Sequence, residues 1–213
     1  TRPSTPASAW KLPKMNLPFN NIMRIILALI ALTLVLPAQA EIFKAKFGTS
    51  KLTINGDSSV HKWKVETKVV GGFLQIDSAA LAKPGKIEVK GKVIIPVRQL
   101  KSGKKRMDEV MHAAMNEKKH KLIDFTLSGL NVNSVKDGVA NCASNGTIKI
   151  NGKTKPLIMN ISIASKNDQL VVRGSANLKM TDFGIKPPSP KLPAGSIVTK
   201  DEIKITFEWV VAR

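Results

Sequence analysis

The sequence predicts an all-β, mainly antiparallel protein with one short amphipathic helix. From residue 41 onward, apolar residues alternate with polar ones, and many of them are β-branched or aromatic. Glycine, asparagine, aspartate and proline separate these alternating runs, as expected for turns. Only one segment has the spacing of a helix. Many short strands with few helices between them indicate a barrel or a sandwich.

The alternating pattern places strands along almost the whole of residues 41–213. Three dipeptides are suited to hairpin turns, because their residues tolerate positive φ: Gly71-Gly72, Asn151-Gly152 and Asn167-Asp168. The expected strands lie near residues 42–47, 50–55, 60–70, 72–77, 86–97, 122–133, 138–150, 154–165, 169–181 and 202–212.

The expected helix lies between Ser102 and Asn116. Its apolar residues Met107, Val110, Met111 and Ala114 recur at the spacing of one helix face. This face could simply cover the core, or its flexible methionines could line a ligand cavity. Both interpretations stay open.

Residues 186–195 form the other irregular stretch, because their prolines exclude a central strand. We expect a loop here. Loops at the mouth of a barrel often contact ligands, but a plain connection explains the composition equally well.

Residues 23–40 have the pattern of a secretory signal peptide. A basic start precedes an apolar run over residues 25–36, and small residues precede the expected cleavage after Ala40. The run is shorter than the roughly 20 residues that a membrane-spanning helix needs. We therefore expect residues 1–22 to be a non-structural extension and residues 41–213 to be the folded domain, periplasmic or secreted.

The chain is strongly basic, with 34 lysine and arginine against 15 aspartate and glutamate residues. Only Arg2, Lys11, Lys14 and Arg24 of the basic residues precede residue 41, so the expected domain is basic too. Such charge favours anionic partners such as membrane surfaces. Cys142 is the single cysteine, which excludes an intrachain disulfide.

The sequence offers little that could support catalysis. His61 on an expected strand, His112 on the helix and His120 in a lysine-rich turn form no metal-binding pair, and no nucleophile or phosphate-binding motif is present. We expect no enzyme activity, no metal and no cofactor. Nucleic-acid binding is not expected either, because Phe73, Phe125 and Phe207 occupy inward-looking strand positions instead of an exposed stacking platform.

Four stretches of the sequence are informative when they are taken together. They are residues 56–63 (GDSSVHKW) with 71–73 (GGF), 97–103 (VRQLKSG) with Met107-Asp108 and Met111, 146–156 (GTIKINGKTKP), and 178–188 (LKMTDFGIKPP). In their joint occurrence, order and spacing, which is the specific feature, they resemble the YceI-like family, the lipid- or polyisoprenoid-binding proteins of bacteria. The resemblance implies a lipocalin-like barrel of about eight strands with an apolar tunnel. It also implies a bound isoprenoid lipid, quinone or other long-chain amphiphile.

On this interpretation a small set of side chains lines or closes the cavity, although ordinary core packing could explain each one singly. The candidates are His61, Trp63, Phe73, Met107, Met111, Phe125 and Phe183. His61 could donate a hydrogen bond to a lipid head group, and Lys186 or Lys191 could meet a phosphate. The resulting hypothesis is an exported, non-catalytic lipid carrier, in which a homodimer is also plausible from the resemblance. The alternative is a periplasmic interaction or stress-response protein with a structural cavity and a basic docking face.

Overall fold

The computed structural model describes residues 40–192 and 195–213, and residues 39–213 form one compact unit. The expected N-terminal extension and all of the expected signal peptide except Ala40 lie outside the described residues. Among the described residues, no helix is long and apolar enough to cross a membrane.

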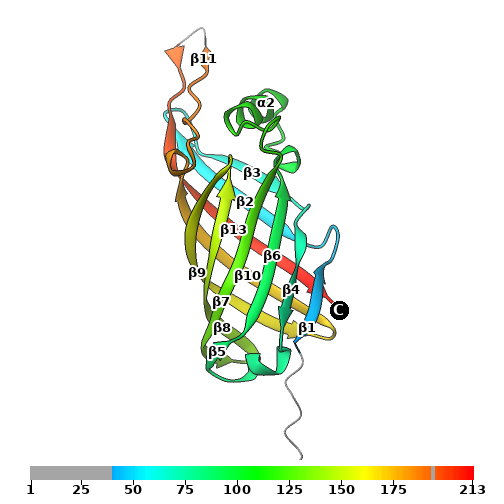
Figure 1. Cartoon of the computed structure of the whole chain (residues 1–213). Helices are drawn as coiled ribbons and strands as arrows, with labels where there is room; N and C mark the ends of the chain where they lie inside the picture. The colour runs from blue at the N-terminus through cyan, green and yellow to red at the C-terminus, as the bar shows by residue number, and fades with distance from the viewer. Residues whose placement is uncertain (1–39, 193–194) are drawn as a thin grey trace, which may run out of the picture. The chain divides into compact units, whose positions relative to one another are not determined.

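Antiparallel strands dominate the structure, which confirms the all-β prediction (Figure 1). The strands are β1 (Glu41–Ala45), β2 (Lys51–Ser58), β3 (Trp63–Thr67), β4 (Gly71–Ile76), β5 (Gly85–Ile87), β6 (Val89–Pro96), β7 (Leu122–Lys136), β8 (Val139–Ile150), β9 (Lys153–Lys166), β10 (Gln169–Lys179), β11 (Lys191–Leu192), β12 (Gly195–Ser196) and β13 (Thr199–Ala212). The helical elements are the 3-10 turns η1 (Ser78–Ala82), η2 (Val97–Gln99) and η3 (Thr181–Phe183), and the α-helix α2 (Lys105–Ala114).

Eight of these strands close into a barrel in the order β1-β4-β6-β7-β8-β9-β10-β13, because β1 pairs with both β4 and β13. Toward the helix, β13 pairs instead with β2, and β2 pairs with β3. A bridge between Glu66 and Lys101 then continues the wall beyond β3. The position next to β13 is thus shared by two strands, β1 and β2, and the position after it is shared by β4 and β3. Closure satisfies strand edges that would otherwise be exposed.

Tight turns connect the long strands. Asn151-Gly152 joins β8 to β9, and Asn167-Asp168 joins β9 to β10, with positive φ at Asn151, Gly152 and Asn167, as predicted. The prediction for Gly71-Gly72 is wrong. These residues begin β4, where they pair with Ile94 and Val93 of β6. β3 and β4 form no hairpin, because β3 pairs with β2 whereas β4 pairs with β1 and β6.

One end of the barrel, near β5 and η1, is filled by side chains. Phe43, Ile76, Leu81, Leu170 and Val211 are buried there as members of one hydrophobic cluster. Cys142 belongs to the same cluster, and burial raises the pKa of its thiol to about 11. We call this the β5 end, and the opposite end, where α2 lies, the α2 end (Figure 1).

The predicted helix is present as α2 and lies across the opposite opening (Figure 1). The predicted proline-rich loop over residues 186–195 is present in part. Residues 187–190 are irregular, but Lys191–Leu192 and Gly195–Ser196 pair as a two-stranded hairpin, which the prediction did not include.

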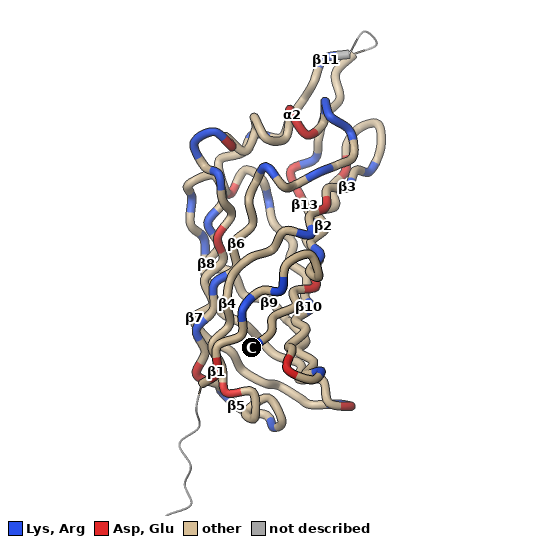
Figure 2. Tube along the Cα trace, turned by 90° about the vertical axis from the view of Figure 1, so that its right-hand side faces the viewer, with Lys and Arg blue, Asp and Glu red and all other residues tan. Residues whose placement is uncertain are grey.

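Figure 2 shows charged positions along the strands and on the end loops. Lys86, Lys90 and Lys92, which alternate with inward-facing residues of β5 and β6, are exposed. This arrangement agrees with a solvated strand face.

Gly72 allows β4 to approach β6 closely. Its φ is +127°, and a Cβ there would collide with the carbonyl group of Lys92. Gly85 has a similar φ of +146° but open space around its Cβ position. We expect Gly72→Ala to lower the free energy of unfolding by about 3 kcal/mol and Gly85→Ala by about 1 kcal/mol, since only Gly72→Ala adds a backbone collision to the backbone strain. Chemical denaturation of both variants measures this difference; equal losses would contradict the close approach.

Candidate functional site

A cavity of about 710 Å³ occupies the barrel between the α2 end and the packed β5 end. Its wall comes from alternate, inward-facing positions of the strands. On β13 the lining residues run from Thr199 to Trp209, which is roughly 33 Å of strand at about 3.3 Å per residue. The cavity therefore extends along most of the length of β13.

The wall is apolar along most of its length. Ile54, Leu130, Ile161, Val172 and other aliphatic side chains form its deeper part. Two buried polar residues, Ser58 at the mouth and Ser144 deeper in the wall, line the cavity among the described residues, and the Ser144 hydroxyl donates to the Met159 carbonyl oxygen at 3.0 Å. No aspartate or glutamate lines the cavity among the described residues. A wall of this kind suits hydrocarbon and offers few polar groups to fix a small polar ligand.

Three aromatic rings lie over inward-facing glycines, which make room for them. A Cβ on Gly56 would collide with the Trp63 ring, one on Gly146 would come within 2.6 Å of Phe125, and one on Gly174 within 2.7 Å of Phe207. All three rings line the cavity. Because these positions are glycine, the three rings can stay close to the wall and do not project further into the lumen.

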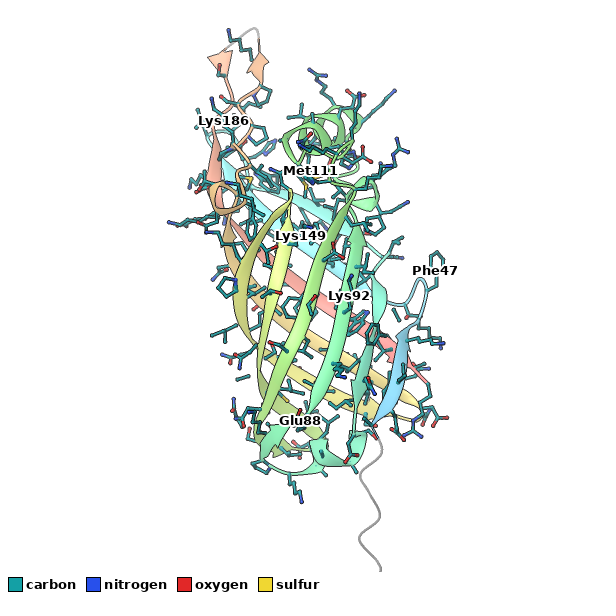
Figure 3. All side chains as sticks on the ribbon, in the orientation of Figure 1. Phe47, Glu88, Lys92, Met111, Lys149 and Lys186 are labelled. Atoms are coloured by element: carbon teal, nitrogen blue, oxygen red, sulfur yellow. The ribbon has the colours of Figure 1, made fainter. Side chains whose placement is uncertain are left out.

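Helix α2 covers the opening with its apolar face. Met107, Val110, Met111 and Ala114 all line the cavity, and Figure 3 shows Met111 at this end of the barrel. No residue of α2 is fully buried, because the space beneath the helix is hollow. The two interpretations of this face, a cover for the core and a lining for a ligand cavity, are thus compatible, because the helix covers the barrel with the same residues that line the cavity.

Polar contacts hold α2 to the segment that precedes it. Ser102 donates from its backbone N and its Oγ to Asp108 Oδ1, at 2.7 and 2.6 Å. His112 Nε2 lies 3.0 Å from the Leu100 carbonyl oxygen. Burial disfavours the charged form of Asp108, but the hydrogen bonds from Ser102 outweigh it and hold the pKa of Asp108 below its usual value. The start of the helix is therefore fixed by a charged carboxylate.

His61 lies at the mouth of the cavity, in the connection between β2 and β3 and not on a strand as predicted. Its backbone is held by Ser58, whose Oγ accepts from His61 N at 3.2 Å and donates to His61 O at 2.7 Å. The imidazole ring is exposed and makes no hydrogen bond among the described residues. Next to it, Trp63 Nε1 donates to the Asp57 carbonyl oxygen at 3.2 Å.

The structure brings six of the seven predicted site residues to the cavity. These are His61, Trp63, Met107, Met111, Phe125 and Phe183. Phe73 does not line it, contrary to the expectation, and its side chain is 39% exposed. Its neighbours Leu74 and Ile76 point inward, and adjacent residues of a strand face opposite sides, so Phe73 faces outward.

Several residues that shape the wall were not among the predicted site residues. Phe207, which was predicted at an inward-looking strand position but not as a site residue, and Trp209 line the deep part of the cavity from β13, and their alternation with Ile203 and Ile205 is the signal that could have assigned both to the site. Trp209 Nε1 is buried without a hydrogen-bond partner among the described residues, so packing alone holds this ring. The contacts of Gly56, Gly146 and Gly174 with aromatic rings depend on strand register, which the sequence does not show.

These features define a class of protein, a closed antiparallel barrel with one elongated apolar cavity under a helical cover. The model of the YceI-like domain matches residues 37–211, and the chain belongs to this family. No curated protein sequence is significantly similar to the chain.

Solved structures of the same fold share little sequence with this chain. BcnA of Burkholderia cenocepacia has a TM-score of 0.63 at 16% identity, covering 78% of this chain and 98% of that one. A polyisoprenoid-binding domain from Saccharophagus degradans, described as implicated in plant cell wall breakdown, has a TM-score of 0.58 at 12% identity, covering 80% and 97%. The YceI protein of Campylobacter jejuni has a TM-score of 0.56 at 16% identity, covering 73% and 87%. At these identities the likeness shows the fold.

The contact between Gly56 and Trp63 gives a direct test of the wall. We expect Gly56→Ala to displace the Trp63 ring and to lower the free energy of unfolding by about 2 kcal/mol, because the added methyl group cannot fit. Gly129→Ala is the matched control, since the nearest atom to its Cβ lies at an ordinary 3.7 Å. Tryptophan emission in a Trp10→Phe/Trp209→Phe background, in which Trp63 is the remaining tryptophan, measures the displacement, and an unchanged spectrum would argue against the packing of Trp63 on Gly56.

Asp108 should make the anchoring of α2 dependent on pH. The pKa of Asp108 is lowered in the folded state. Its charged carboxylate therefore adds to the free energy of unfolding at pH values above the ordinary aspartate pKa of about 4, and this contribution is lost as pH falls through the lowered pKa of the folded protein. We expect Asp108→Asn to cost about 1 kcal/mol at neutral pH and nothing once pH lies below the folded pKa. Denaturation across this pH range measures both, with exposed Asp182→Asn as control; a cost independent of pH would exclude the role of the charge.

Proposed function

We propose that the protein is an exported, non-catalytic carrier that holds a long apolar isoprenoid lipid, or a related amphiphile, in its barrel. The observation that carries the proposal is the 710 Å³ cavity with an apolar wall along its length. Its volume lies within the range of about 300 to 1,000 Å³ that is usual for ligand pockets. Membership of the YceI-like family and the shared fold with a polyisoprenoid-binding domain support the same ligand class.

An apolar wall is sufficient for tight binding of such a ligand. Burial of a methylene group contributes about 0.8 kcal/mol, so a chain with about ten buried carbons gains about 8 kcal/mol before the costs of association. No directed hydrogen bond is needed inside the barrel. Selectivity then depends on the length and width of the cavity and on the few polar groups at its mouth.

The polar head of the ligand would lie at the α2 end. His61 is the histidine that lines the cavity, and its exposed ring can donate a hydrogen bond to an oxygen atom of a head group. The deep wall has no comparable group, because the Ser144 hydroxyl is already bonded to Met159. This polarity gradient sets the orientation, with the chain inward and the head outward.

The lining supports a binding role in preference to catalysis. Among the described residues that line the cavity there is no carboxylate or thiol, and the lining histidine is at the mouth. A hydrolase would need a nucleophile with a base in hydrogen-bond reach. Export to the periplasm or outside the cell, and a homodimeric state, remain predictions from the leader-like segment and from the family.

Mass spectrometry of organic extracts tests the proposal. Protein purified after export would be compared with a mock purification, and a stoichiometric long-chain amphiphile is the expected result. A protein that is empty and also takes up no added quinone or polyprenol would refute the carrier role. It would leave the alternative, an interaction protein with a structural cavity.

Ala176 offers a way to fill the cavity without touching the mouth. It lines the cavity from β10, whereas its neighbour Asn177 is exposed. We expect Ala176→Phe to reduce lipid uptake at least tenfold, because the ring occupies space that the chain needs, while Asn177→Phe leaves uptake unchanged. Titration with a fluorescent prenyl probe measures this, and equal uptake by both variants would place the binding site elsewhere.

A further inference from the structure

The α2 end of the barrel carries two exposed valines, on two segments that hydrogen bonds join. Val60 is 64% exposed and Val198 is 60% exposed. Ser59 N donates to the Val198 carbonyl oxygen at 2.8 Å, and Val198 N donates to Ser59 Oγ at 3.0 Å, so the two segments that carry the valines, far apart in sequence, are held together. We call Val60 and Val198 the apolar pair.

The apolar pair lies at the rim of the cavity mouth. Ser58 and His61 line the cavity on either side of Val60 in the sequence, and Ile197 and Thr199 do so on either side of Val198. The valines therefore face solvent directly beside the opening. Nothing in the fold requires an apolar side chain at these two exposed positions.

Lysines surround the same end. Several exposed lysines on its segments take part in no ion pair among the described residues, and six of them are Lys104, Lys105, Lys118, Lys119, Lys186 and Lys191. Lys104 and Lys191 also line the cavity. Figure 2 shows basic positions along the segments around α2, and Figure 3 shows Lys186 near Met111 at this end.

Most acidic residues at the α2 end are already neutralised. Asp57 pairs with Lys200 at 2.7 Å, Glu109 with Arg106 at 3.3 Å and Glu117 with Arg98 at 3.8 Å. Among the described residues there, the carboxylates outside such ion pairs are Asp182, Asp201 and Glu202, and Asp201 accepts hydrogen bonds from Thr181. The end thus combines an excess of unpaired positive charge with exposed apolar tips.

The geometry points to docking of the α2 end on a bilayer that contains anionic phospholipid. The six lysines would meet the phosphate groups, and the apolar pair would enter the interface between head groups and chains. Docking in this orientation places the cavity mouth against the membrane. Docking would then allow lipid to transfer between the bilayer and the barrel. This transfer rests on the proposed function, whereas the docking itself does not.

Vesicle flotation with the barrel unit, residues 41–213, tests the docking, since this unit contains a closed barrel and its own core. Protein should float with vesicles of phosphatidylcholine and phosphatidylglycerol but not with phosphatidylcholine alone, and salt should weaken binding. Absence of flotation with the anionic vesicles overturns the proposal. Equally strong binding to duplex DNA would show an unselective polyanion surface and would also overturn it.

Charge reversal separates docking through one end from general attraction. The variant Lys104→Glu/Lys105→Glu/Lys186→Glu should lose at least tenfold in vesicle affinity, because each lysine near an anionic surface contributes roughly fivefold. The control Lys86→Glu/Lys90→Glu/Lys136→Glu makes the same charge change at the β5 end and should retain affinity within about twofold of the parent. Equal losses in both variants would contradict a defined docking end.

The apolar contribution has its own control. Val60→Ser/Val198→Ser should weaken vesicle binding severalfold, whereas Ile158→Ser, which removes a 73% exposed side chain from the outer wall, should not. Equal binding by the valine variant would exclude insertion. Lipid content of the purified protein is measured in parallel: protein that contains lipid but does not float refutes docking alone, and empty protein that floats refutes the carrier role alone.

Discussion

The pairing of β1 with β13 is the constraint on which the rest of the structure depends. β1 is five residues long, yet it bonds to β4 on one side and to β13 on the other. Lys46 N adds a bond to the Val210 carbonyl oxygen, and Arg213 pairs with Glu41 at 2.9 Å. Without this short strand, β4 and β13 would be open edges, and the apolar interior would face solvent instead of a closed lumen.

The same closure explains why one end is packed and the other hollow. β13 bonds to β1 near the β5 end and to β2 near the α2 end, so a break between β1 and β2 allows one long strand to serve both. At the β5 end, η1 and the side chains around Phe43 fill the interior. Between there and the α2 end, glycines face the lumen beneath aromatic rings, and the interior stays open.

The strand positions and the helix could be predicted because a period of two and a helical spacing are local properties of the chain. Other features depend on register between strands. Phe73 was assigned to the interior by its residue type, whereas the inward positions of Leu74 and Ile76 decide its direction. In β7, the pairing with β8 is irregular between Leu127 and Gly129, and the inward-facing residues change there from odd to even residue numbers. No turn signal in the sequence indicates this change. The contacts of Gly56 with Trp63 and of Gly174 with Phe207 arise from neighbouring strands in the same way.

The half-buried face of α2 has a consequence for the empty protein. Met107, Met111 and the other lining residues of the helix have hollow space beneath them in place of packed side chains, so an unloaded barrel lacks part of its own interior. A bound chain would supply the missing contacts and act as a removable piece of the hydrophobic core. Cargo and cover would then stabilise each other, and the empty molecule would be the form in which the helix opens most readily and is most easily reached by a protease.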